Sequence, residues 1–265
     1  MNGNDWQDGH DIRHNSRKLP LLGLALAFVT AVGNLSAAAA QERPAASDGP
    51  LAQAIAAANE KSTSADYAYT RHLQIDADDE RVDRVERYDP RHPEGQRWQL
   101  LQVDGASPTA EDLDSYDPGE SPGESQNAFE LYHALVGELD LESAMLVEMT
   151  PEQALYRIDL EKGRFLSGDS REFAEQLNGR LAVDRRGKEP HISRFELWAD
   201  DPFSPSFGAE IERFQMKFSY RRLPETGDVL PESVAVDISV EAMIFFSVDA
   251  MTRLAFSDYE AVSGE

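Results

Sequence analysis

The sequence predicts a mainly β protein, built as a single curved antiparallel sheet that forms an incomplete β-barrel with a few short helices. From Tyr67 onward, apolar and polar side chains alternate with a period of two, which is typical of strands with one buried face. Turn-forming residues separate about ten such strands, and few stretches carry helical spacing. A sheet this wide must curl, so its concave face is either filled by its own side chains or encloses a cavity.

Residues 1–40 have the three parts of a secretory signal peptide. Basic residues precede an uncharged run over 19–40, and Ala38 and Ala40 supply the small side chains of a cleavage site. The run is also long enough for a single N-terminal membrane anchor, and this alternative stays open. No paired arginine precedes the run, so Sec-type export to the periplasm is expected. Residues 41–50 follow as a spacer.

Composition excludes several classes of protein. The chain has no cysteine, so it forms no disulfide and has no thiolate ligand or nucleophile. Its formal net charge is −24, which disfavours binding to nucleic acid or anionic membrane and favours solubility. Residues 51–265 are long enough for a single domain with one core. No integral membrane segment is expected after signal cleavage.

The domain is predicted to begin with a helix and a β-hairpin. Residues 51–61 have helical spacing of apolar side chains, and Asp48 is expected to cap the helix. A strand over 67–75 and a second strand over 81–88 are expected to pair across a turn at 76–80.

The stretch RYDPRHPEGQRWQLLQVDG is predicted to be a long hairpin connection that leads into a strand over 97–103. Trp98 and Leu100 are expected to face the concave side of the sheet. Alternation then places Leu101 and Val103 on the opposite side. The connection is expected at the rim of the concavity, without a catalytic role.

An acidic segment rich in proline and glycine comes next. A short helix is expected within 106–116, with Thr109 as its cap. Residues 112–127 are expected to form an acidic mobile loop on the surface, because they combine high charge with helix-breaking residues.

The second half of the chain is predicted to consist of further strands and one short helix. The helix is expected over 170–177. The strands are expected over 138–149, 154–160, 181–183, 192–198, 210–223, 233–248 and 253–262.

Motifs that resemble catalytic or metal sites lack the context that those sites need. Gly119–Gly123 matches G-x-S-x-G around Ser121, but loop sequence flanks it where a strand and a helix are required. DLDSYDPG has Tyr116 where a calcium loop needs Asp or Asn, which leaves only a weak site of scattered carboxylates as an alternative. The histidines show no metal-ligand spacing. The sequence therefore predicts neither enzyme activity nor a cofactor or metal.

Arg71 interrupts an otherwise apolar face of the first strand. A buried guanidinium needs a partner or water. It is expected either to form an ion pair with a buried carboxylate, to reach water at a strand edge, or to be a polar group in a binding cavity. The inward apolar side chains are likewise either core or cavity lining. The candidate lining residues are Tyr67, Tyr69, Arg71, Leu73, Trp98, Leu100, Phe214, Met216, Phe218, Val236, Ile238, Phe246 and Phe256.

The order of these segments resembles a known superfamily. A signal peptide, the helix LAQAIAAANEK, the strand YAYTRHLQI, the stretch RYDPRHPEGQRW and broad sheet strands are similar to the periplasmic lipoprotein carrier LolA and its outer-membrane receptor LolB. The resemblance covers most of 51–262 in architecture and element order. It implies an incomplete barrel whose helices form a lid over an apolar cavity for acyl chains. It also implies that Arg71 matches an inward arginine that latches the lid, whereas the acidic insert at 112–126 departs from the pattern.

These features lead to two hypotheses of function. The first is a soluble periplasmic protein that binds or carries a lipid, a lipoprotein acyl chain or another amphiphile in an apolar cavity. The alternative is a protein-interaction or scaffold module of the envelope without a small ligand, in which the acidic loop or a sheet edge contacts a protein partner.

Overall fold

The computed structural model describes residues 49–61, 66–78, 80–116, 128–161, 173–206, 209–242 and 246–262. Its helices are α2 (Pro50–Glu60), α3 (Ala110–Ser115) and α4 (Ala128–Glu138), with a 3-10 turn η2 (Leu141–Ser143). Its strands are β1 (Asp66–Ala77), β2 (Glu80–Tyr88), β3 (Trp98–Val103), β4 (Ala144–Met149), β5 (Gln153–Ile158), β6 (Leu177–Asp184), β7 (His191–Ala199), β8 (Phe203–Ser206), β9 (Ala209–Arg222), β10 (Val229–Ala242) and β11 (Phe246–Val262).

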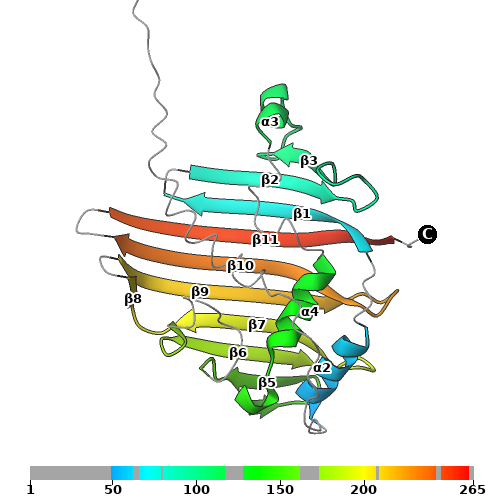
Figure 1. Ribbon diagram of the computed structural model, residues 1–265, viewed down its shortest axis with the longest axis vertical. Coiled ribbons are helices and arrows are strands. Elements are labelled where there is room, and N and C mark those ends of the chain that lie inside the picture. Colours follow the sequence, from blue (N-terminus) through cyan, green and yellow to red (C-terminus); the bar gives the residue numbers. More distant parts are fainter. Residues whose placement is uncertain are drawn as a thin grey trace, which may run out of the picture.

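All the strands belong to one open antiparallel sheet (Figure 1). Its order is β3-β2-β1-β11-β10-β9-β7-β6-β5-β4, with the short β8 paired to β9. The chain therefore builds one edge first, crosses to the far edge at β4, and returns strand by strand until β11 pairs with β1. The predicted fold class is confirmed, and the sheet stays open between β3 and β4.

The two faces of the sheet differ as the alternation predicts. On the convex face, Arg213 pairs with Asp237 at 2.9 Å and with Asp249 at 3.2 Å. On the concave face, apolar side chains oppose one another across β9 and β10: Phe214 and Ile238, Met216 and Val236, and Phe218 and Val234. Burial of these cross-strand pairs stabilises this half of the sheet.

Helix α4 was not predicted, and the strand predicted from Glu138 begins only at Ala144. The spacing of Tyr132, Leu135, Val136 and Leu139 is helical, and all four side chains are buried. The signal was therefore present in the sequence, but it is short and adjoins a strand of similar hydropathy.

Three further boundaries differ from prediction. The strand predicted over 233–248 is two strands, since β10 ends at Ala242 and β11 begins at Phe246. In the helix predicted over 170–177, residues 173–176 form a turn and Leu177 already belongs to β6, while 170–172 lie outside the described part. The short β8 was not predicted. Each difference lies at a chain reversal, where alternation alone gives no endpoint.

The predicted helix cap at Thr109 is confirmed. Its hydroxyl accepts a hydrogen bond from the backbone N–H of Asp112, whose carboxylate accepts one in return from the backbone N–H of Thr109. Residues 112–115 are thus helical, which corrects the loop predicted from Asp112, and residues 117–127 lie outside the described part. The cap predicted at Asp48 is wrong, because Gly49 occupies the N-cap position of α2, without a side-chain hydrogen bond; Asp48 itself lies outside the described part.

The described residues leave out the predicted signal peptide at 1–40. Among the helices that the structure describes, none is long and apolar enough to span a membrane.

Candidate functional site

Two helices lie over one half of the concave face (Figure 1). Helix α2 packs on β6 and β7, and α4 packs on β10, on β1 and against α2. The buried hydroxyl of Tyr132 on α4 accepts a hydrogen bond from the backbone N–H of Ile192 on β7 at 3.1 Å. The helices are therefore attached to the sheet by apolar packing and by a specific polar contact.

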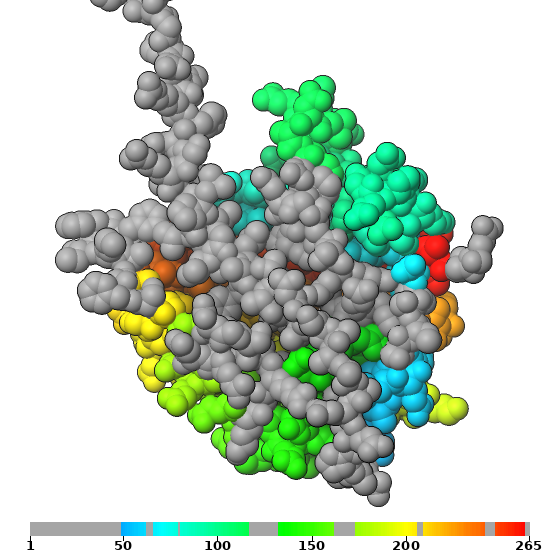
Figure 2. Space-filling view, viewed as in Figure 1, coloured from blue at the N-terminus to red at the C-terminus, as the bar shows by residue number. Residues whose placement is uncertain are grey.

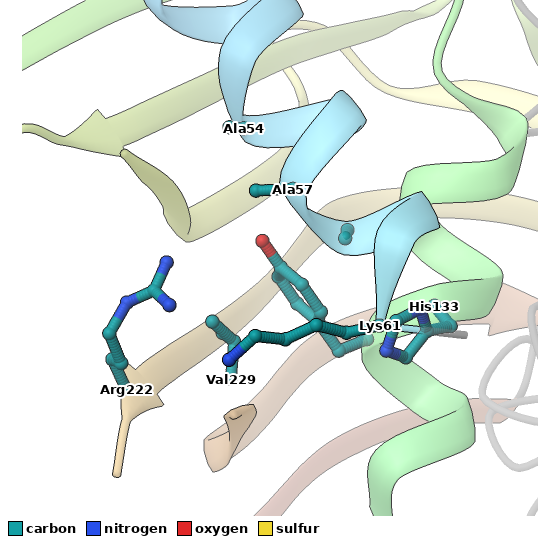
Figure 3. Close-up of a pocket in the computed structure, with 8 residues that line it drawn as sticks. Ala54, Ala57, Lys61, His133, Arg222 and Val229 are labelled. Carbon is teal, nitrogen blue, oxygen red and sulfur yellow. The ribbon is translucent and has the colours of Figure 1, made fainter. Parts of the chain in front are cut away.

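The pocket beneath these helices is very small (Figure 3). It lies between α2, α4 and the β9–β10 hairpin, with Lys61, His133, Arg222 and Val229 in its wall and a volume of about 10 Å³. This is about the space of a single water molecule, too little for an acyl chain. The Lys61 ammonium is held by the carbonyl oxygen of Gly227 at 2.7 Å, so this group closes the helix onto the hairpin.

Most candidate lining residues lie in one core cluster. Its members from the list are Tyr69, Leu73, Phe214, Met216, Phe218, Val236, Ile238 and Phe256, and Trp98 packs against them. Tyr67 lies in a separate small cluster with Leu230. Leu100 is half-buried on β3, and the side chain of Phe246 is outside the described part.

The β3 side of the concave face carries a group of aromatic side chains, the aromatic wall: Tyr69, Tyr88, Trp98, Phe256 and Tyr259. The Tyr69 ring is central, with centroid distances of 5.1 Å to Tyr88, 5.7 Å to Trp98 and 5.8 Å to Phe256. These rings come from β1, β2, β3 and β11. Burial raises the pKa of the Tyr69 phenol, so this side chain stays neutral.

A buried charged cluster, Arg71, Arg84 and Glu86, adjoins the aromatic wall. Arg71 and Glu86 are direct cross-strand partners and are 2 % and 0 % exposed. The Nε and Nη2 atoms of Arg71 lie 2.7 and 2.5 Å from Oε2 of Glu86. Arg84 Nε lies 3.3 Å from Oε1 of the same carboxylate. Of the alternatives for Arg71, the ion pair with a buried carboxylate is confirmed.

The charged cluster and the aromatic wall are in contact. The Arg71 guanidinium carbon lies 3.9 Å from the ring centroid of Trp98, a close cation–π arrangement. Arg84 stacks more loosely on Tyr116, at 5.9 Å. Burial raises the pKa of the Tyr116 phenol, and the negative charge of Glu86 raises it further. Cations, a carboxylate and aromatic rings thus meet at one place on the concave face.

Sequence reasoning missed Arg84, Glu86 and Tyr116. Arg84 and Glu86 are two residues apart on the predicted strand 81–88, so their side chains must lie on the same face of the sheet. The sequence did not show which face this is. The register that sets Glu86 opposite Arg71 shows that it is the concave face. Tyr116 adjoins them through tertiary structure, without a local signal.

One predicted orientation is wrong. Glu86 pairs with Leu100 and Arg84 pairs with Val103, so a bulge at Leu101 adds one residue to β3. Val103 is therefore on the same face as Leu100. Of the two side chains predicted on the opposite side, only Leu101 faces outward, and it is 42 % exposed. The segment that carries β3 and α3 projects from the β2 edge of the sheet, as the green atoms at the top of Figure 2 show.

Comparison of the chain with models of known protein families, with curated proteins and with solved structures finds no match. In the part of the chain that the structure describes, no group of three or more His, Asp or Glu side chains is placed to hold a metal ion.

Proposed function

We propose that the protein binds a lipid or another amphiphile, with the apolar chain along the aromatic wall and the polar head at the charged cluster. The observation that carries this proposal is the contact between the two groups, at Arg71 and Trp98, on the β3 side of the concave face. Ligand pockets are typically apolar with a few placed polar groups, and this buried group of side chains has that composition.

The environment that suits this function is the periplasm, reached through the predicted signal peptide. A carrier that moves between two anionic membranes must not adsorb to either of them. A net charge of −24 serves that requirement, because it repels anionic lipid surfaces. The experiment must identify the class of the ligand, which is a lipid, a lipoprotein acyl chain or another amphiphile.

The test is native mass spectrometry of protein purified from a bacterial periplasm, with organic extraction of the same sample. We expect a bound mass that extraction identifies as an acyl-chain compound. Protein without bound mass, which also fails to take up an added fluorescent fatty acid, would contradict the proposal and indicate a self-filled core.

Two tryptophan variants locate the site. Trp98→Leu removes the ring that stacks on Arg71, and we expect it to reduce ligand occupancy. Trp198→Leu is the matched control, because Trp198 is also a half-buried strand residue stacked on an arginine, Arg180, at 5.0 Å. Equal occupancy in the two variants would place any ligand away from the aromatic wall.

A further inference from the structure

The last strand of the sheet, β4, has an apolar surface that nothing in the described structure covers. Among the described strands it pairs only with β5, which leaves its other edge open. Its exposed fractions are high for apolar side chains: Met145 is 56 % exposed, Leu146 46 %, Val147 61 % and Met149 48 %. Because neighbouring residues of a strand point to opposite faces, the strand exposes apolar groups on both sides.

Such an edge is unusual in a soluble protein. Natural edge strands are protected from further pairing by lysine, by proline or by covering segments, because unpaired backbone N–H and C=O groups can bind another strand. In β4 the protection is limited to a bulge at Val147 and one charge, Glu148. The opposite edge is better covered, since Ala106 bridges back to Val103 on β3. An exposed apolar edge of this kind marks an interaction surface.

The charges around β4 indicate which kind of segment can bind to this edge. Residues 138–152 contain five acidic side chains and no Lys or Arg. The neighbouring cations are Arg157, which donates to the Met145 sulfur at 3.7 Å, and Arg185, which donates to the carbonyl oxygen of Thr150. The surroundings remain net acidic, so a second copy of this chain would be repelled, and a basic segment would be attracted.

We propose that β4 docks an extended segment of another protein, one that alternates apolar residues with Lys or Arg. The segment would add to the sheet as one further strand. Its backbone N–H and C=O groups pair with the open edge of β4, and its apolar side chains cover Met145, Leu146, Val147 and Met149. Its cations lie near the acidic residues that flank the strand.

The test uses the purified protein and a fluorescent lysine–valine repeat peptide, KVKVKVKV. We expect saturable binding by fluorescence anisotropy, with amide-exchange protection concentrated at 144–149. The same peptide with N-methylated backbone amides cannot form the strand pairing, and we expect it to bind at least about tenfold more weakly. Equal binding of the methylated peptide would overturn the proposal, because plain electrostatic attraction would then explain both.

Two edge variants complete the test. Val147→Lys places a charge at the bulge of β4, and we expect about tenfold weaker peptide binding. Leu101→Lys is the matched control at the bulge of β3, on the opposite edge, and we expect a change within about twofold. Equal losses in both variants would overturn the proposal. Concentration-dependent dimers that Val147→Lys abolishes would overturn it too, by making a second copy the occupant.

Discussion

The guanidinium of Arg71 is placed by cross-strand register rather than by a local motif. Alternation along β1 turns the side chain toward the concave face. The register of β1 with β2 then sets Glu86 directly opposite it, and no periodicity in a single strand gives that register. The partner of Arg71 is therefore fixed by the chain reversal that sets Ala77 opposite Glu80.

Breaking this ion pair from one side should destabilise the fold. We expect Arg71→Met to lower the free energy of unfolding by about 3 kcal/mol, because it leaves the Glu86 carboxylate buried with a poorer set of partners. The double variant Arg71→Met, Glu86→Leu removes both charges and should recover most of that loss. Denaturant titration measures both. A double variant no more stable than the single one would show that the pair does not act as a unit.

The buried imidazole of His191 should make the stability of the fold depend on pH. Burial, assisted by the positive charge of Arg222, lowers the pKa of this imidazole from 6.5 to about 4. The unfolded chain therefore takes up a proton first as the pH falls. We expect stability to decrease between pH 6.5 and 4, by ~1–2 kcal/mol, less than the full shift implies because the ring is partly exposed.

His191→Gln should reduce this slope in denaturation curves measured across that pH range. Part of the slope should remain, because burial also lowers the pKa of His133. A variant with the same slope as the wild type would remove His191 from the explanation.

At the scale of elements, helix α2 is joined to the β9–β10 hairpin at one point. The Lys61 ammonium binds the carbonyl oxygen of Gly227 and lies 3.5 Å from the carboxylate of Asp228, which also accepts a hydrogen bond from Tyr67. The helix itself was predictable from its spacing. This contact was not, because its two sides are far apart in the sequence.

Gly227 is the position where an added side chain would most disturb the contact between Lys61 and the β9–β10 hairpin. Its φ is +73°, and an added Cβ would lie 2.9 Å from the Lys61 nitrogen. We expect Gly227→Ala to cost about 1–2 kcal/mol and to increase amide exchange at the end of α2. Gly187→Ala is the control, since its Cβ would make only an ordinary contact of 3.7 Å. Equal stability of the two variants would show that the contact between Lys61 and Gly227 does not stabilise the fold.

At the scale of the molecule, the fold class followed from the sequence, but the sheet order did not. Alternation is local and marked most strands, which is why the mainly β fold with few helices was predictable. The crossing of the chain to β4 at the far edge and the closing pair of β1 with β11 are non-local. The two edges, and hence the apolar edge at β4 and the projecting β3 segment, could not be located from alternation alone.

The net charge of −24 gives a prediction for the whole chain. Self-repulsion destabilises a compact state, and salt weakens it by shortening the Debye length from about 30 Å at 0.01 M to about 8 Å at 0.15 M. We therefore expect the melting temperature to rise between these two concentrations of sodium chloride, a salt chosen because sulfate would also strengthen apolar burial. A falling melting temperature would mean that exposed pairs such as Arg213 with Asp237 outweigh the repulsion, and that the acidic surface serves binding or solubility at no cost in stability.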